Sequence, residues 1–315
     1  MRYLVYGVVI DSDVALGVPA STGPVNVTVK ELQQPVDSGS ITWLDRGSDT
    51  WMSAGLVGGS FYLRFGEEAE FLIAADGRSL RWYSFEEVSD TLVHLVLDHV
   101  LPRALMRLDR IVLHGSCVAR HERGCVAILG RSGSGKSTLA AGLVARGCSL
   151  IADDCVVIQR QDGVFLVTPA YPGLRLTNNS VRLSGINGFE VRGAVSRHSP
   201  KRRMTPRGGD DPPPAARHRL LAVVALQDFG HHDRNAGTAS CLKLAPSAAG
   251  IELLRHSFHL NGPGEHAAFF ERVLPVAAAC PVFQMFYSHS HVGLELAARE
   301  IESILSSGVT REVHL

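Results

Sequence analysis

The chain of 315 residues has little lysine. Its only ammonium side chains are those of Lys30, Lys136, Lys201 and Lys243, so arginine supplies nearly all of its basic charge. It also has no excess of charge of either sign, because 31 basic and 31 acidic side chains balance. A chain without a net charge has no global electrostatic attraction to nucleic acid or to a membrane surface, so we expect neither as a partner.

Paired cysteines and long apolar runs are also missing. The six cysteines are dispersed without a C-x-x-C pair, which favours reduced, packed thiols over disulfides or a metal cage. The first ten residues lack the long apolar core and the cleavage site of a signal peptide, and no later apolar run reaches membrane-spanning length. We therefore expect a cytoplasmic protein without a membrane span.

A glycine-rich loop stands out, with the spacing G-x-x-x-x-G-K-[ST]. Glycines let successive backbone N–H groups surround phosphate oxygens, Lys136 adds charge for the β- and γ-phosphates, and Ser137 offers a hydroxyl to Mg²⁺. An apolar run precedes the loop and apolar residues at helical spacing follow it, so strand, loop and helix come in the required order. The loop predicts ATP and Mg²⁺ binding through Gly130, Arg131, Ser132, Gly133, Ser134, Gly135, Lys136, Ser137 and Thr138.

Two adjacent carboxylates, Asp153 and Asp154, end the next apolar run, one helix after the loop. A strand that delivers carboxylates at its end is typical of a Mg²⁺-holding element, and the competing interpretation is a surface Asp-Asp turn. In phosphoryl transfer the two aspartates could divide the roles of base and metal ligand. His114 breaks a strand expected at residues 111–119 and could line the same pocket, although a lone histidine in an apolar run is more often a core residue.

The order of elements predicts an α/β fold with two parts. Residues 1–90 read as a small, mainly antiparallel β-rich module, with strands expected at 3–10, 25–29, 61–65, 71–74 and 79–83. Residues 91–315 read as the second domain. It begins with a helix at 89–108 that Pro102 should kink or split, and ends with helices near 247–258, 265–279 and 293–305 and a strand at 282–287.

Residues 194–218 are rich in Arg, Pro, Gly and Ser, which predicts a mobile basic loop. Within this loop, Lys201, Arg202 and Arg203 could clamp a phosphate or an acidic peptide, or could simply be solvated. The histidines of 231–233 and of 289–291 could be read as metal ligands, but the polarity of surface loops explains them with fewer assumptions.

Three motifs together resemble the catalytic domain of HPr kinase/phosphorylase and its HPr-kinase-like relatives. They are Leu113-His114-Gly115, the loop from Gly130 to Ser137, and Ala152-Asp153-Asp154, and the resemblance covers residues 113–176 well. It implies a P-loop kinase core in which His114 and Lys136 lie in the active site. One of Asp153 and Asp154 would deprotonate the acceptor serine and the other would support the metal, with Ser137 and Asp154 as the expected ligands. Residues 171–176 are also similar, which makes Arg175 a candidate for substrate contact.

Departures from the family narrow the expected function. Thr138 stands where bifunctional HPr kinases usually have an acidic residue, and their N-terminal module is not found. The layout looks closer to HPr-kinase-like proteins encoded beside peptide-modification systems, some of which phosphorylate a serine of a ribosomally made precursor peptide. We expect an ATP-dependent kinase that acts on a Ser or Thr of a peptide or small protein. A small-molecule hydroxyl kinase, a nucleotide-dependent switch protein and a homo-oligomer all stay open.

Overall fold

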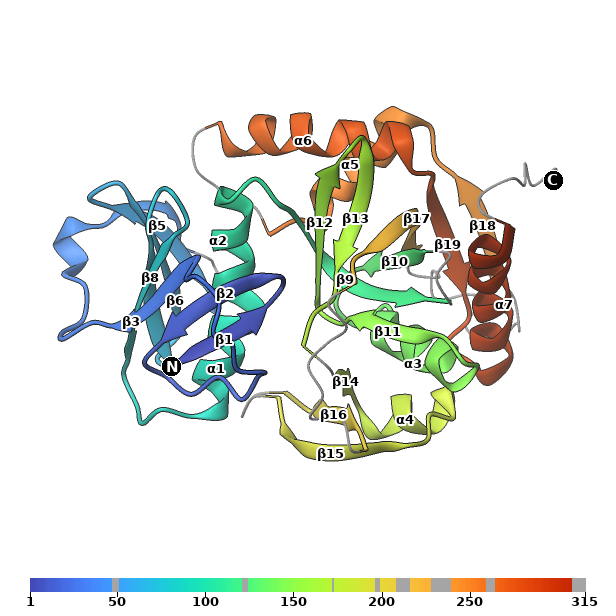
Figure 1. Ribbon diagram of the computed structural model, residues 1–315, viewed down its shortest axis with the longest axis horizontal. Helices are drawn as coiled ribbons and strands as arrows, with labels where there is room; N and C mark the ends of the chain where they lie inside the picture. Colours follow the sequence, from blue (N-terminus) through green and yellow to red (C-terminus); the bar gives the residue numbers. More distant parts are fainter. Residues whose placement is uncertain are drawn as a thin grey trace.

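The computed structural model describes residues 1–46, 51–120, 124–171, 173–195, 199–207, 216–227, 239–258 and 264–307. In these ranges the chain is a mixed α/β protein, whose strands form two sheets of eight strands and one sheet of three. Figure 1 shows the first large sheet on one side of the molecule and the second on the other, with the helix α2 between them.

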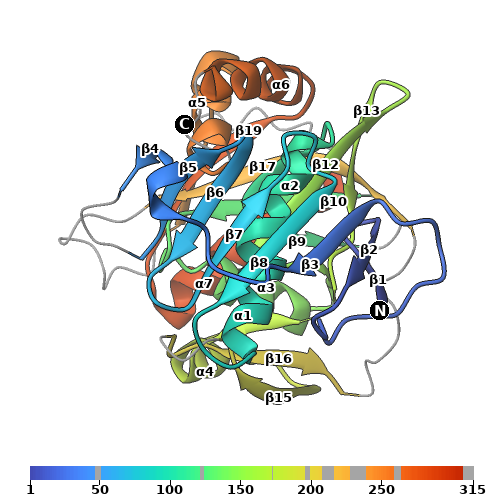
Figure 2. The ribbon, with the colours of Figure 1, turned by 90° about the vertical axis from the view of Figure 1, so that its left-hand side faces the viewer.

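The first sheet comes entirely from the N-terminal part of the chain. Its strand order among the described residues is β1-β2-β3-β8-β7-β6-β5-β4, and its parallel pairings there are those of β3 with β2 and with β8, so the sheet is mainly antiparallel as expected. Figure 2 shows this sheet face-on. Its strands are β1 (Arg2–Val5), β2 (Val8–Ser12), β3 (Val27–Glu31), β4 (Thr42–Asp45), β5 (Ser53–Val57), β6 (Ser60–Phe65), β7 (Ala69–Ile73) and β8 (Ser79–Ser84), with a short 3-10 turn at Ser38–Ser40.

The single strand expected at residues 3–10 is wrong, because β1 and β2 form a hairpin there. The turn consists of Tyr6 and Gly7, which both have positive φ angles, of 52° and 71°. Two central residues with positive φ suit the right-handed twist of a two-residue hairpin, but Asn-Gly or Asp-Gly is the usual sequence signal. Tyrosine gives no such turn signal, so the apolar residues on both sides of the turn predicted one continuous strand.

One interrupted helix follows, made of α1 (Asp90–Leu95), a π-helical turn (Val96–Val100) and α2 (Leu101–Arg107). The interruption expected from Pro102 is present as the π-helical turn, which ends two residues before this proline. In the π-helical turn the amide of Leu101 donates to the carbonyl of Val96, five residues back. A proline ring would clash with the carbonyl four residues earlier in a regular helix, and the wider turn relieves that clash.

The second large sheet surrounds the glycine-rich loop. Its path is β10-β9-β12-β13-β17-β19-β18, with β11 beside β9 and a further pairing of β10 with β17. β9 changes partner on one edge where the sequence predicts a break, since Leu113 bridges Ser257 there and residues from Gly115 pair with β10. Its other edge pairs with β12 and then with β11. The strands are β9 (Ile111–Ala119), β10 (Cys125–Gly130), β11 (Ser149–Ala152), β12 (Cys155–Gln161), β13 (Val164–Thr168), β17 (His218–Gln227), β18 (Ala239–Lys243) and β19 (Val282–Tyr287).

Helices cover both faces of this sheet. Along β10, Val126 and Ile128 pack in one apolar cluster with residues of α3 and α7, whereas Ala127 and Leu129 belong to a second cluster with residues of α5 and α6. Alternate side chains of a strand point to opposite faces, so both faces of β10 are buried. These helices are α3 (Lys136–Ala145), α5 (Pro246–Arg255), α6 (Glu265–Ala279) and α7 (His291–Ser307).

A three-stranded sheet corrects part of the prediction of a loop over residues 194–218, of which 196–198 and 208–215 lie outside the described residues. Strand β16 (Arg202–Pro206) lies within that range and pairs with β14 (Leu174–Leu176) and β15 (Phe189–Ala194). Its only buried residue is Met204, and charged side chains flank it, so composition concealed the strand. The short helix α4 (Asn178–Ser184) joins β14 to β15, and its N-cap Thr177 accepts from the amide of Ser180.

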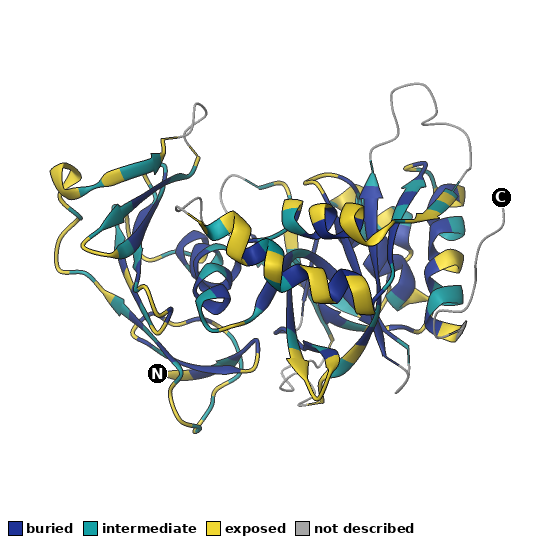
Figure 3. Ribbon diagram, turned by 90° about the horizontal axis from the view of Figure 1, so that it is seen from above, coloured by how far each residue is buried: buried dark blue, intermediate teal, exposed yellow. Residues whose placement is uncertain are grey.

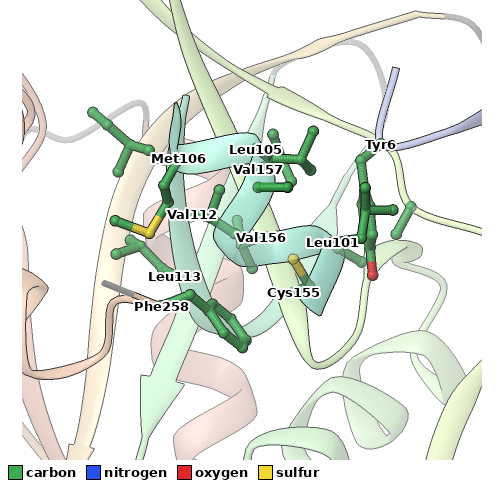
Figure 4. Close-up of a cluster of buried hydrophobic side chains, with 14 of the residues drawn as sticks. Tyr6, Leu101, Leu105, Met106, Val112, Leu113, Cys155, Val156, Val157 and Phe258 are labelled. Carbon is green, nitrogen blue, oxygen red and sulfur yellow. The ribbon is translucent and has the colours of Figure 1, made fainter. Parts of the chain in front are cut away.

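One continuous apolar cluster joins the N-terminal sheet to the second large sheet. It includes Tyr6, Leu97, Leu101, Cys155 and Val157, which come from both sides of the domain boundary expected near residue 90. In Figure 4, Tyr6 lies close to Leu101 and Cys155. Figure 3 shows the helices between the two sheets as mostly buried. The boundary itself stays a prediction.

Candidate functional site

The glycine-rich loop connects β10 to α3 and needs its glycines for backbone conformation. Gly130 and Gly135 have φ angles of 152° and 93°, which residues with a Cβ atom rarely adopt. A Cβ on Gly135 would also collide with the hydroxyl of Tyr287. The Oγ of Ser134 is buried within the loop and has no hydrogen-bond partner among the described residues. Such a cradle of backbone amides with an unpaired hydroxyl suits phosphate oxygens.

Lys136 begins α3 and bends back over the loop. Its Nζ donates to the carbonyl oxygens of Gly130, at 2.8 Å, and Arg131, at 2.9 Å. Burial lowers the pKa of Lys136 to about 8, although Asp154 and Asp153 act in the opposite direction. The ammonium group is therefore largely protonated near neutral pH and lies where the phosphates of a nucleotide would meet the loop.

Asp153 follows β11 and lies directly beneath the loop. Its Oδ1 accepts from the hydroxyls of Ser137, at 3.0 Å, and Ser116, at 2.6 Å, and its Oδ2 accepts from the amide of Arg175, at 2.9 Å. The side chain is buried, and burial together with the charge of Asp154 raises its pKa. A serine hydroxyl paired with a carboxylate at the start of α3 suits Mg²⁺, which binds one or two protein oxygens and completes its shell with phosphates and water.

Asp154 faces the other way because its backbone turns. Its φ is 65°, in the left-handed region that aspartate tolerates better than most residues. The carboxylate lies 3.2 Å from the Nε of Arg175, and the carbonyl oxygen lies 3.1 Å from the Nδ1 of His114. Burial alone would raise the pKa of Asp154, but Arg175 and then His114 lower it. Asp154 is thus the more readily ionised of the two aspartates.

His114 lies on β9 beside Asp154, at the point where the strand changes partner. Its amide donates to the carbonyl of His256, at 2.6 Å, which fixes the backbone at the bend. Burial lowers the pKa of His114 to about 4, with Lys136 acting in the same direction. The imidazole is therefore neutral near pH 7, and the structure brings it to the same site as Lys136 and both aspartates.

Arg175 on β14 is fully buried and holds both aspartates. Besides its ion pair with Asp154, it donates from Nη1 to the carbonyl of Asp153, at 3.2 Å, and from Nη2 to the Oδ2 of Asp98, at 2.7 Å. Although burial lowers its pKa, the surrounding carboxylates raise it well above the ordinary value. This guanidinium lies beneath the site, and its predicted contact with a substrate stays a prediction.

The three predicted basic residues around β16 lie in different places. Lys201 lines the same cavity as Lys136 and Ser137. Arg203 is paired across from Arg175 in the sheet, with its guanidinium 6.0 Å from the ring of Tyr171. Arg202 is exposed. Only Lys201 of the three is brought to the loop.

Two cavities meet the glycine-rich loop at its two halves. One, of about 260 Å³, touches the loop from Gly133 to Thr138 and extends to Ser180 and the rings of Tyr287 and His289. The hydroxyl of Thr138 donates to Ser180 there, at 2.9 Å. The other, of about 790 Å³, is lined by His114, Gly130, Arg131, Ser132, Leu226, Gln227, Glu252, Arg255, His256 and Ser257. The loop therefore separates two spaces that could hold different molecules.

Metal and membrane features are limited in the described ranges. No group of three or more His, Cys, Asp or Glu side chains there could hold a metal ion by itself, and residues 231–233 lie outside those ranges. No described helix is both long and apolar enough to cross a membrane.

Four residues of the site were not predicted. Ser116 donates a hydrogen bond to Asp153. Tyr171 contacts the guanidinium of Arg175 and donates to Asp98, and the hydroxyl of Tyr6 also lies within hydrogen-bond distance of Asp98. Ser116 could have been found from its place two residues after His114 on one strand, because such residues share a face. The signal for Asp98 was a lone carboxylate among the apolar residues of a helix. Nothing local marks Tyr6.

Comparison with known proteins finds HPr kinases. Residues 107–187 match the family described as HPr Serine kinase C-terminal domain. HPr kinase/phosphorylase from Chlorobium phaeobacteroides (strain BS1) is 37% identical over 81 residues, which make up 26% of this chain and 23% of that protein, so the match spans about a quarter of the relative. The HPr(Ser) kinase/phosphatase from Coxiella burnetii aligns with a TM-score of 0.32 and 11% identity, covering 61% of this chain and 94% of that one.

The sequence matches make this chain HPr kinase-like over residues 107–187. That segment contains His114, the glycine-rich loop, both aspartates and Arg175. It does not contain Tyr6, Asp98 or Lys201.

Proposed function

We propose that this protein is an ATP-dependent kinase that transfers the γ-phosphate to a serine or threonine hydroxyl of a peptide or small protein. One observation carries the proposal. Beneath the glycine-rich loop, Asp153 accepts a hydrogen bond from Ser137, while Asp154 lies next to His114. These contacts support one carboxylate as a metal ligand and the other as the base for an acceptor hydroxyl.

The residues divide into a nucleotide side and an acceptor side. Residues 130–138 would surround the phosphates, with Lys136 as their main cation and Lys201 as a second one from the same cavity. Ser137 and Asp153 would hold Mg²⁺, which supplies charge neutralisation for the transferred phosphate. This refines the expectation that Asp154 is the ligand, because Asp153 is the aspartate bonded to Ser137.

Asp154 would act as the base. It takes the proton of the acceptor hydroxyl while that oxygen bonds to the γ-phosphorus and the bond from phosphorus to the β,γ-bridging oxygen breaks, which leaves ADP. Arg175 keeps Asp154 ionised and so able to accept the proton. Neutral His114 can hydrogen-bond the incoming hydroxyl.

The acceptor would enter through the larger cavity. That cavity contains His114 and reaches the N-terminal half of the loop, whereas the smaller one extends from Lys136 and Thr138 toward aromatic rings that suit a nucleoside. The matched family is described as a serine kinase domain, which supports a serine acceptor. A volume of about 790 Å³ also suits a small molecule, so a small-molecule hydroxyl kinase is the second candidate.

To test this proposal, the protein is incubated with Mg²⁺, ATP labelled at the γ-phosphate, and a library of peptides. Each serine- or threonine-containing peptide is compared with a counterpart in which alanine replaces the hydroxyl residue. Transfer to hydroxyl peptides alone supports the proposal. Lys136→Ala should abolish it, and Lys243→Ala is the control because this exposed lysine on β18 lies outside the site. Label found only in small molecules would favour the second candidate. Nucleotide-dependent partner binding with slow hydrolysis and no labelled acceptor would indicate a switch protein instead.

A further inference from the structure

The N-terminal hairpin inserts its turn into the second part of the molecule. Tyr6, at the tip of that turn, is buried, and its ring meets the ring of Tyr171 with centroids 6.0 Å apart. Its hydroxyl lies 3.3 Å from the carbonyl of Leu97 and 3.5 Å from Oδ1 of Asp98. A bulky residue at positive φ is strained, so tertiary contacts must hold it there. Figure 4 shows Tyr6 beside Leu101 and Cys155.

Asp98 is the carboxylate that this hairpin reaches. It lies in the π-helical turn with only 2% of its surface exposed. Its Oδ2 accepts from Arg175 and lies 2.7 Å from Nδ1 of His94, while its Oδ1 accepts from the hydroxyl of Tyr171. Burial would raise the pKa of Asp98, but Arg175 and His94 lower it well below its usual range. Asp98 is therefore a permanently charged partner for Arg175.

Arg175 carries the connection onward to the site. The same guanidinium that binds Asp98 also contacts the carboxylate of Asp154 and the carbonyl of Asp153. Desolvating a buried ion pair costs free energy that well-packed apolar residues would not, so such a pair is weak evidence for a role in stability. Arg175 is shared between Asp98 and both aspartates of the site, and a cation held in this way can orient catalytic groups.

We propose that Asp98 is a positioning residue, held by Tyr6 of the N-terminal hairpin, which fixes the Arg175 guanidinium and through it the geometry of Asp153 and Asp154. The inference rests on the proposed kinase function and goes beyond it, because it makes the N-terminal sheet a structural part of the catalytic centre. Without Asp98, the Arg175 guanidinium loses one of its carboxylate partners and is free to rotate, which misaligns the Asp154 carboxylate that it already contacts. Nucleotide contacts made by the loop are left in place.

The test compares Asp98→Asn and Tyr6→Phe with two matched controls. Glu265→Gln removes a carboxylate from an ion pair with Arg107, and Tyr62→Phe removes a buried hydroxyl bonded to Glu70, both away from the site. The readout is turnover of Mg·ATP to phosphate, with kcat and KM determined separately and folding checked by circular dichroism. We expect Asp98→Asn to lower kcat at least tenfold with KM changed less than threefold, and Tyr6→Phe to lower kcat about threefold. Both controls should keep kcat within twofold of the wild type.

The double variant carrying Asp98→Asn and Tyr6→Phe separates positioning from general damage. If Tyr6 acts through Asp98, the double variant has the kcat of Asp98→Asn alone, whereas independent damage multiplies the two losses. The inference would be overturned if the double variant lost kcat by the product of the two single losses. It would also be overturned if Asp98→Asn folded and kept the kcat of the wild type. If Asp98→Asn does not fold, Tyr6→Phe decides, and a kcat equal to that of Tyr62→Phe overturns it. A wild-type protein that neither binds nor turns over Mg·ATP would instead overturn the kinase function itself.

Discussion

At the scale of single residues, the two adjacent aspartates have opposite environments. Asp153 accepts from two serine hydroxyls and a backbone amide, and its pKa is raised. Asp154 faces a guanidinium and a histidine, and its pKa is lowered. We therefore expect these neighbours in sequence to have separate chemical tasks, which substitution can distinguish.

Replacing each aspartate by asparagine should give different defects. Asp153→Asn should raise the Mg²⁺ concentration needed for half-maximal activity at least tenfold, because a neutral amide binds the cation less well. Asp154→Asn should lower kcat by roughly 10²- to 10⁴-fold with little change in Mg²⁺ dependence, because the base is lost. Magnesium titrations of steady-state turnover check both. Asp162→Asn, in an exposed turn, is the control, and identical defects in the two variants would contradict separate roles.

His99 should make the folded state sensitive to acid. Burial, with help from His94 and Arg103, lowers its pKa from 6.5 to about 3. Between those values the unfolded chain binds a proton that the folded protein does not, so this contribution to stability is present above pH 6.5 and is lost as the pH falls toward 3. His99→Phe cannot be protonated and should lose less stability between pH 7 and pH 4.5.

Urea midpoints at the two pH values measure this difference. His291→Phe, which removes an exposed imidazole at the start of α7, is the control. Equal acid sensitivity of wild type and His99→Phe would show that protonation of His99 does not contribute.

At the scale of elements, the change of partner along β9 depends on Gly115. A Cβ at this position would lie 2.6 Å from the carbonyl oxygen of Ile128 on β10. Gly115→Ala should therefore push β9 away from β10 and destabilise the protein by about 1–3 kcal/mol. Because His114 and Ser116 flank the glycine, turnover should fall as well. Gly142→Ala is the matched control, since its Cβ would meet Leu294 at an ordinary 3.5 Å in a helix and should be neutral or stabilising.

Chemical denaturation gives the stability change of both alanine variants, and steady-state turnover of the folded fraction gives the catalytic effect. A Gly115→Ala protein as stable and as active as Gly142→Ala would contradict the close approach of the two strands.

Elements with strong periodicity or a motif were predictable from the sequence. Helix α6 and strand β19 lie at the residues expected for them, and the glycine-rich loop lies between a strand and a helix as the motif requires. Strands β15, β16 and β18 were missed because all their side chains except that of Met204 are exposed or half-buried, and such strands carry little apolar signal. The hairpin turn at Tyr6 was missed because its stabilising contacts are far away in sequence.

The residues of the candidate site also fall into those that the sequence could predict and those that it could not. His114, Lys136, Ser137 and both aspartates could be chosen from local motifs, and the structure brings them together. Asp98 carried only the weak signal of a lone carboxylate in an apolar helix, because its importance depends on a partner 77 residues away. Residues that act through long-range contacts leave no spacing pattern for sequence reasoning to detect.

At the scale of the whole molecule, the shared apolar cluster should make the protein unfold as one unit. The three tryptophans all lie in the first 82 residues, so their fluorescence reports the N-terminal sheet, while circular dichroism at 222 nm reports helices that lie almost entirely beyond residue 89. Because one cluster includes residues of both parts, we expect the two signals to change at the same urea concentration. Leu97→Ala, within that cluster, should shift both midpoints together and cost about 2–5 kcal/mol.

Separate midpoints for the two signals would contradict this and would favour two independent domains with a boundary near residue 90. The number of subunits stays a prediction, and sedimentation of the full chain would measure it.

The left-handed backbone of Asp154 has a consequence for anyone who diversifies this protein by mutagenesis. Residue 154 must provide a carboxylate and must also adopt a φ of 65°, and few amino acids can do both. Glutamate, usually ranked as the nearest substitute, keeps the charge but adopts this conformation less readily than aspartate or asparagine. A mutant library at residue 154 should therefore retain folded proteins with asparagine or glycine, while activity returns only with aspartate.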